Sequence, residues 1–397
     1  MTLSNRQLFL KYVGQTSGHP LQLEIERAEG IYFYTPGGKR YIDLVSGVSV
    51  SSLGHNHPAI IEAVKSQVDK HMHLMVYGEF VQSTQVKYAA WLSGHLPDDL
   101  DVVYYVNSGS EAIEGAMKLA KRYTGRPEIL AFNKAYHGST HGALSILGDK
   151  KFHAGFLPLL PGINHAEFND PAALEMITEN TAAVVVEPIQ AEAGIIEPHE
   201  GFLKKLREKC DQTGTLLVLD EIQTGFGRTG KLFAFEHYEI VPDIICFAKS
   251  FGGGMPLGAF VSSGEKMRSL TQNPELGHIT TFGGHPVSCA AGLAAQKFVE
   301  KNQLIAHAKV MGELYKELMV HDGICEVRGK GLFLAVEFNN TISGKRLMEN
   351  IFANGIILDQ FLFCDNAFRI APPFIITEEE VRNSASLLLD AIESSRI

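Results

Sequence analysis

Residues 244–261, IICFAKSFGGGMPLGAFV, place a single lysine between two apolar runs. The first run is short, begins with β-branched residues and leads into a glycine-rich turn, a pattern typical of a buried strand. Lys249 is therefore expected at the mouth of a strand, where α/β proteins keep their ligand sites. Burial lowers the pKa of an amine, and a neutral amine attacks carbonyl carbons. The alternative is a lysine at the start of a loop with its ammonium in solvent, as most lysines are.

The rest of the chain alternates apolar strands with helices. Continuous apolar strands separated by helices indicate a mostly parallel sheet covered on both faces, the α/β class. Polar residues follow each strand and are expected to meet at the same edge of the sheet. The pattern predicts strands at 102–106, 129–132, 181–186, 215–219 and 244–248, and helices from 58 to about 70, from about 110 to 123, at 201–213 and at 286–301.

Both ends of the chain have a different pattern. Residues 31–34 and 40–44 flank TPGGK at 35–39 and predict a hairpin. After residue 320 come an apolar run at 331–338 and a last helix that begins with a capping box, Thr377 with Glu380. We expect an N-terminal segment, 1–50, that contributes to a small domain, a large α/β domain at 51–310, and a small C-terminal α+β domain at 320–397.

Composition limits the function. The 397 residues carry a net charge of -10, which argues against a general nucleic-acid binder. Five scattered cysteines form no CxxC pair, so that neither a disulfide framework nor a metal site is indicated, and a reducing, cytoplasmic setting is expected. The sequence shows neither the apolar core of a signal peptide at 1–11 nor an apolar run of about 20 residues, so we expect no membrane span.

Three polar motifs follow three of the predicted strands. Residues 107–110, NSGS, precede a helix and could bind an anion, although Ser and Asn are also ordinary helix caps. Asp220 ends an aliphatic strand and needs a cationic partner, which is either Lys249 in a plain ion pair or a protonated ring nitrogen. A lysine for an aldehyde, a carboxylate for a ring nitrogen and an anion site for a phosphate are what pyridoxal phosphate requires. Tyr136 is available as an aromatic wall.

The chain resembles the class III pyridoxal-phosphate aminotransferases of fold type I. Such enzymes have a large domain with a mostly parallel sheet and a small α+β domain. The motifs occur in the family's order and extend over nearly the whole chain. They are LGHNHP at 53–58, NSGSEA at 107–112, YHG at 136–138, EPIQ at 187–190, LDEIQTGFGRTG at 219–230, Lys249 with its glycines, TFGGHP at 281–286, and Arg369 before Pro372 and Pro373.

The resemblance implies a role for each matching residue. Lys249 and Asp220 would be catalytic: Lys249 would bind the cofactor aldehyde and move a proton, and Asp220 would keep the ring nitrogen protonated. Thr281 would reach the phosphate of the neighbouring subunit, which implies a homodimer with shared active sites; locally, Thr281 also fits a helix cap, and Tyr136 also fits a core aromatic. The implied cofactor-binding residues are Ser108, Gly109, Ser110, Tyr136, His137, Glu187, Asp220, Gln223, Lys249 and Thr281.

Two further residues concern the substrate. In ornithine-type relatives, a glutamate at the position of Glu192 pairs with the arginine matching Arg369 and releases it for an α-carboxylate. The alternative is a surface salt bridge worth under about 1 kcal/mol. The family's usual arginine after the His-Gly step is Ser139 here, which puts the anchor for a distal carboxylate in doubt.

The resemblance therefore implies a ping-pong transaminase that moves an amino group from an ω-amino compound, similar to acetylornithine or ornithine, to a 2-oxoacid such as 2-oxoglutarate. Its partners would be these small molecules and a second copy of the chain. The alternatives are a broad ω-amine or 4-aminobutyrate transaminase, an aminomutase or racemase of the same fold, and a cofactor-free regulatory protein.

Overall fold

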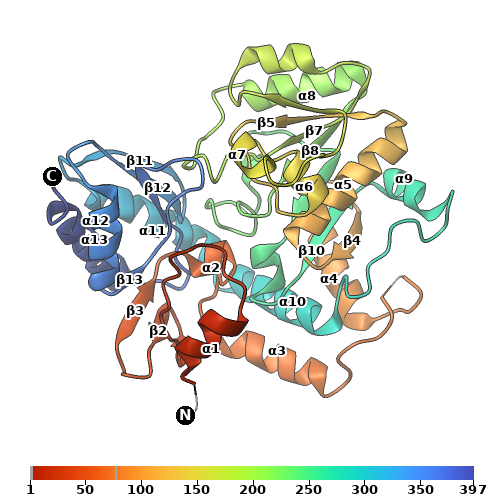
Figure 1. Cartoon of the computed structure of the whole chain (residues 1–397). Helices are drawn as coiled ribbons and strands as arrows, with labels where there is room; N and C mark the ends of the chain where they lie inside the picture. Colours follow the sequence, from red (N-terminus) through yellow and green to blue (C-terminus); the bar gives the residue numbers. More distant parts are fainter. Residues whose placement is uncertain (1–2, 77) are drawn as a thin grey trace.

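A computed structural model describes residues 3–76 and 78–397 (Figure 1). Its centre is a seven-stranded sheet in the order β4-β10-β9-β8-β7-β5-β6. Only β10 runs antiparallel to its neighbours, so the expected mostly parallel α/β sheet is confirmed. The strands are β4 (Val102–Val106), β5 (Glu128–Phe132), β6 (Ile163–Ala166), β7 (Thr181–Val186), β8 (Leu216–Asp220), β9 (Ile244–Phe247) and β10 (Gly258–Ser262).

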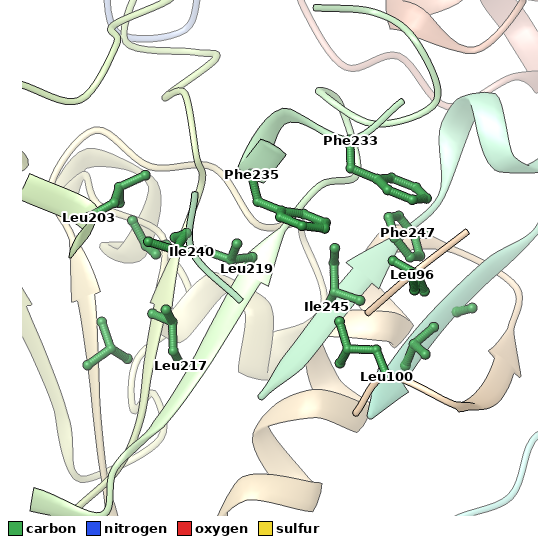
Figure 2. Packing of buried hydrophobic residues seen from close by; sticks show 14 of the residues in the cluster. Leu96, Leu100, Leu203, Leu217, Leu219, Phe233, Phe235, Ile240, Ile245 and Phe247 are labelled. Atoms are coloured by element: carbon green, nitrogen blue, oxygen red, sulfur yellow. The ribbon is translucent and has the colours of Figure 1, made fainter. Parts of the chain in front are cut away.

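The central strands are buried on both faces because both faces carry apolar side chains. Leu217 and Leu219 of β8 join one core cluster, while Leu216 and Val218 point to another, which includes the apolar side of α5. Figure 2 shows the first face, where Leu217 and Leu219 of β8 and Ile245 and Phe247 of β9 belong to the same apolar cluster as Phe233 and Phe235. Since every residue of β8 is buried, Asp220 is drawn into the interior at the end of its strand.

The helices that cover the sheet begin and end largely where the sequence predicts. The caps explain several of these limits: Ser108 caps α5, Gly125 ends it in a left-handed conformation, and Thr377 and Glu380 form the predicted capping box of α13. The sequence analysis missed the longer helices α1, α4 and α11 and the short helices α2, α6, α7 and α9. The helices are α1 (Asn5–Tyr12), α2 (Ser46–Ser49), α3 (Pro58–Val68), α4 (Ser83–Ser93), α5 (Gly109–Thr124), α6 (His141–Ser145), α7 (Lys150–His153), α8 (Phe202–Thr213), α9 (Gly264–Met267), α10 (Pro286–Lys301), α11 (Leu304–Leu318), α12 (Gly344–Ala353) and α13 (Glu378–Glu393).

Two smaller sheets lie beside the central one. The first has the order β1-β2-β3-β13 and contains the predicted hairpin, β2 (Tyr32–Tyr34) with β3 (Arg40–Asp43). Its other strands are β1 (Arg27–Glu29) and β13 (Ile356–Ile357). Strand β13 pairs parallel to β3, so a C-terminal segment joins the N-terminal sheet (blue beside red in Figure 1). The division into domains at 51–310 and 320–397 stays a prediction, as does the assignment of 1–50, whose residues 1–2 lie outside the described part.

The second of the smaller sheets has the order β11-β12-β14, with β11 (Ile324–Lys330), β12 (Phe333–Phe338) and β14 (Ala367–Ile370).

Arg228 fastens this second sheet to the loop after β8. Its fully buried guanidinium donates to the carbonyl oxygens of Leu332 at 3.0 Å and Pro372 at 2.6 Å, and its carbon lies 4.5 Å from the centre of the Phe374 ring. Burial lowers the pKa of Arg228 to about 9, although Asp43 opposes the shift. These bonds fix β14 relative to the end of β8, where Asp220 lies.

In the described part of the chain, the helices are too short or too polar to span a lipid bilayer.

We predict that Phe247→Ala lowers the free energy of unfolding by about 3–5 kcal/mol, because it opens a cavity in the core of Figure 2. The matched control is Val320→Ala, since Val320 is 75% exposed and its loss removes little packing. Urea unfolding of the purified proteins measures both changes. Equal midpoints for the two variants would contradict the packing seen around β9.

Candidate active site

The polar motifs meet in a cavity of about 420 Å³ at the carboxyl ends of the parallel strands. This edge is where the alternation of strands and helices predicts a site. Glu192 and Arg369 lie behind Gln223 and contact it. Thr281 is exposed and is not part of the wall of its own chain's cavity. The sequence-predicted residues that line the cavity are Ser108, Gly109, Ser110, Tyr136, His137, Glu187, Asp220, Gln223 and Lys249.

Lys249 begins a single 3-10 turn, Lys249–Gly252, two residues after β9 ends. Its φ of 52° is left-handed, a conformation that costs free energy for a residue with a side chain and occurs where the surroundings enforce it. Burial, and then the charge of Arg369, lower the pKa of the amine, and the carboxylates of Glu192 and Asp220 oppose this only in part. The amine of Lys249 lines the cavity, and it loses its proton more easily than the amine of a lysine in water, which favours the nucleophilic neutral form.

Asp220 binds His137 rather than Lys249. Its Oδ2 lies 2.7 Å from Nδ1 of His137, and its Oδ1 accepts the N–H of Ile222 at 3.0 Å. Among the described residues Asp220 forms no ion pair with Lys249, so that alternative is wrong. Burial disfavours a charged His137, yet the bond and charge of Asp220 outweigh it and raise the pKa of the imidazole above its ordinary 6.5. His137 thus holds the carboxylate in place while Asp220 still faces the cavity.

Glu187 holds the backbone next to His137 through hydrogen bonds. Its buried carboxyl accepts the N–H of Ala191 at 3.1 Å and that of Tyr136 at 3.4 Å. Burial raises the pKa of Glu187 to about 7, so the group titrates near neutral pH. Tyr136 is partly buried, and its hydroxyl lies 3.1 Å from Oγ of Ser139 at the rim.

The turn before α5 provides an anion site. Ser108 caps the helix by accepting the N–H of Glu111 at 3.2 Å, so the cap interpretation is right, but the first N–H groups of a helix still face outward. A Cβ on Gly109 would lie 2.9 Å from Cδ1 of Ile222, and one on Gly138 would collide with Oγ of Ser110. A side chain at either place would therefore displace a neighbouring side chain, and Gly138 also has a φ of 127°, which favours glycine.

The donor set fits pyridoxal phosphate: Lys249 faces the cavity as an amine of lowered pKa, Asp220 presents a buried carboxylate, and the N-terminus of α5 presents N–H groups.

Behind the cavity, Arg369 of β14 binds two side chains at once. Its Nη2 lies 2.7 Å from Oε1 of Glu192, and its Nη1 donates to Oε1 of Gln223. Glu192 also accepts the N–H of Leu362 at 3.2 Å. The Arg369 side chain is fully buried, so the pair is no surface salt bridge. Gln223 therefore touches both the cavity and the arginine, a connection that the sequence did not reveal.

The sequence analysis also missed Asp359. Its Oδ1 lies 3.5 Å from Nε of Arg369, and its backbone oxygen accepts the N–H of Arg369 at 3.0 Å. Burial raises the pKa of Asp359 to about 6, although Arg369 opposes the shift. A signal was present: Asp359 ends the apolar run 355–358, just as Asp220 ends the run 216–219.

Comparison with known proteins identifies the family. The sequence profile of the class III aminotransferases matches residues 13–392. The chain belongs to this family. It is 40% identical over 396 residues to an acetylornithine aminotransferase from Methanopyrus kandleri, covering 98% of this chain and 99% of that protein.

Solved structures agree with this assignment. An ornithine aminotransferase from Toxoplasma gondii, described with partial occupancy of PLP at its active site, superposes with a TM-score of 0.90 at 29% identity, over 98% of this chain and 93% of that one. An (S)-enantioselective omega-transaminase from Thermomicrobium roseum gives 0.87 at 27% identity, over 98% and 97%. The expected fold type I is confirmed.

As a class III aminotransferase, the protein is an enzyme that uses pyridoxal phosphate and acts on small molecules, so the interpretation as a cofactor-free regulatory protein is wrong.

We predict that His137 stabilises the apoprotein more at acid than at alkaline pH. Its pKa in the folded state lies above 6.5, so the contribution is fully present below 6.5 and is lost as the pH rises through the folded value. Urea unfolding of wild type and His137→Gln over a range of pH measures it. A difference between the two proteins that is constant or grows with pH would contradict the His137–Asp220 pair.

Proposed function

We propose that the enzyme is a ping-pong transaminase that moves an amino group from an ω-amino compound, similar to acetylornithine or ornithine, to a 2-oxoacid such as 2-oxoglutarate. The observation that carries this proposal is the buried Arg369–Glu192 pair beside the cavity. Arg369 can bind the carboxylate of a substrate, and Glu192 neutralises the charge of Arg369 while no such carboxylate is bound. The names of the acetylornithine and ornithine aminotransferases among its relatives support the same donor class.

Each residue of the cavity has a task in this proposal. When bound, pyridoxal phosphate supplies an electron sink that stabilises negative charge on the amine-bearing carbon. Asp220, held by His137, would keep a proton on the ring nitrogen, and Lys249, whose pKa is lowered, would bind the aldehyde and carry a proton. Gly109 and Ser110 would hold the phosphate with the N-terminus of α5.

Arg369 and Glu192 allow one site to accept two kinds of substrate. While Glu192 occupies Nη2, the guanidinium is neutralised, and a donor whose amine carbon has no carboxylate meets no free cation there. When a 2-oxoacid enters, its carboxylate displaces Glu192 and binds Arg369 through two parallel hydrogen bonds. Because the exchange replaces one ion pair of Arg369 by another, the guanidinium is never left buried without a counter-ion.

Ser139 favours a second candidate, a broad ω-amine or 4-aminobutyrate transaminase. Ser139 is exposed at the rim, where its N–H donates to Oγ of Ser110 at 3.2 Å, and it offers no charge to a distal carboxylate. An aminomutase or racemase with the same cofactor residues is the remaining alternative. Net transfer to an added 2-oxoacid separates both transaminase candidates from these isomerases.

The proposal includes a homodimer with shared active sites. Thr281 is exposed outside its own cavity, while its neighbour Thr280 accepts a hydrogen bond at 2.8 Å from Asn107, which lines that cavity. The segment therefore lies close to the mouth and leaves Thr281 free for a partner's phosphate. A cytoplasmic location is proposed as well, because the five cysteines are all free.

We predict that the purified enzyme transfers amino groups to 2-oxoglutarate from at least one of ornithine, acetylornithine, 4-aminobutyrate, putrescine, lysine and β-alanine. Loss of the visible absorbance of the lysine-bound cofactor follows each donor. Lys249→Ala is expected to abolish both transfer and that absorbance, because Lys249 supplies the one amine that lines the cavity among the described residues. Transfer by the Lys249→Ala variant, or none by wild type with any of these donors, would contradict the proposal.

We predict that mixed dimers of Lys249→Ala and Thr281→Ala subunits regain one intact site. In such a dimer, the intact Lys249 faces the partner subunit's Thr281, which is also intact. Thr281→Ala alone is expected to weaken cofactor affinity about 10–100-fold, the loss of one hydrogen bond to a charged group. Cofactor titration of the mixture measures this, and an affinity equal to the average of the two parents would contradict shared sites.

A further inference from the structure

Arg369 faces a second carboxylate besides Glu192. Asp359 follows β13 by two residues, and its side chain is one-third exposed. Its Oδ1 lies 3.5 Å from Nε of Arg369, beyond good hydrogen-bond geometry. Neither of these two atoms has a hydrogen-bond partner among the described residues. An acceptor and a donor thus lie buried side by side, both unsatisfied, which is rare in folded proteins.

The three nitrogens of Arg369 are therefore not equivalent. Nη1 binds Gln223 and Nη2 binds Glu192, while Nε faces Asp359. A carboxylate that binds an arginine through two parallel bonds needs two neighbouring nitrogens. The edge formed by Nε and Nη2 has a carboxylate at each end, whereas the edge formed by Nη1 and Nη2 has an amide and a carboxylate.

The local charge is negative when both carboxyls are ionised. Glu192 and Asp359 together bring two negative charges to one guanidinium. Lys249 is the other cationic side chain near Asp359, but burial and Arg369 lower the pKa of its amine. The remaining charged groups around the cavity, Asp220 with His137 and Glu187, lie on the cofactor side.

We propose that Asp359 is a specificity-determining residue: it is a second counter-ion of Arg369, which a carboxylate on the amine-bearing carbon must overcome in addition to Glu192. Donors without that carboxylate, namely terminal primary amines and ω-amino acids, do not meet this repulsion. This inference rests on the proposed ω-amino transaminase and names how its site disfavours donors that carry a carboxylate on the carbon bearing the transferred amine. Rejection by an adjacent like charge is a common source of specificity.

The chemistry of the two half-reactions supports this assignment. The 2-oxoacid must still bind Arg369 in the second half-reaction, so the repulsion from Asp359 has to be moderate. Burial raises the pKa of Asp359 to about 6, so its carboxyl gains a proton more easily than an aspartate in water. Because the side chain is one-third exposed, it can also move toward solvent when a second carboxylate approaches. Glu192, by contrast, accepts hydrogen bonds from the N–H of Leu362 and the side-chain amide of Gln223. It has to break both bonds when it leaves Arg369.

Glutamate and 4-aminobutyrate form a matched pair of donors, because they differ only by the carboxylate on the amine carbon. Single-turnover reactions of the holoenzyme with each donor give the ratio of their kcat/KM values. Asp359→Asn is expected to raise this ratio in favour of glutamate by about tenfold. Glu192→Gln serves as a reference with the same direction of change, and Asp359→Glu is expected to stay near the wild-type ratio.

An Asp359→Asn ratio within about twofold of wild type, while Glu192→Gln shifts it, would overturn the role of Asp359 and leave the proposed function standing. No reaction of the wild-type holoenzyme with any ω-amino donor would overturn both. The absorbance of the bound cofactor shows that each variant has an intact site, and Asp359→Ser replaces Asp359→Asn if the latter does not fold. A serine variant that leaves the ratio unchanged likewise overturns the inference.

Discussion

The burial of one carboxylate, Asp220, is the constraint on which the rest of the site depends. Folding of the aliphatic strand β8 removes Asp220 from water, and a buried carboxylate is unstable without partners. His137 at 2.7 Å and the N–H of Ile222 supply them, so the loops after β5 and β8 are held together at one edge of the sheet. The same edge receives Lys249 from β9 and the N-terminus of α5 from β4, which explains why a parallel sheet can collect an amine, a carboxylate and an anion site in one cavity.

Selection of the substrate depends on a second set of buried charges, whose geometry comes from the other sheet. Arg369 stands on β14, and Arg228 fastens the end of that strand to the loop that begins with Asp220. Through Gln223, the arginine is in contact with the wall of the cofactor cavity. A shift of the β11-β12-β14 sheet therefore moves the carboxylate receptor relative to the reacting lysine. The distance between the two is set by hydrogen bonds to backbone carbonyls, which tolerate little displacement.

Much of the fold could be predicted because strong local patterns specify it. The strands β4, β7, β8 and β9 are continuous apolar runs, and the helices α5 and α10 carry clear caps or an N-terminal proline. The two-residue strand β13 was missed because its pairing with the distant β3, rather than its own sequence, makes it a strand. The cofactor residues were found by motif, but their connections were not: His137 is far from Asp220 in sequence, and Gln223 is far from Arg369. Such contacts depend on tertiary packing, which no local spacing encodes.

The most direct measurement of the central claim is to identify the lysine that holds the cofactor. Reduction of the holoenzyme with borohydride makes the link between lysine and pyridoxal phosphate permanent, and peptide mass spectrometry then locates it. The cavity places a single lysine, Lys249, within reach of Asp220 and the N-terminus of α5. The expected result is one modified peptide, carrying the added mass on Lys249. Modification of another lysine, with Lys249 unmodified, would contradict the assignment of this cavity as the active site.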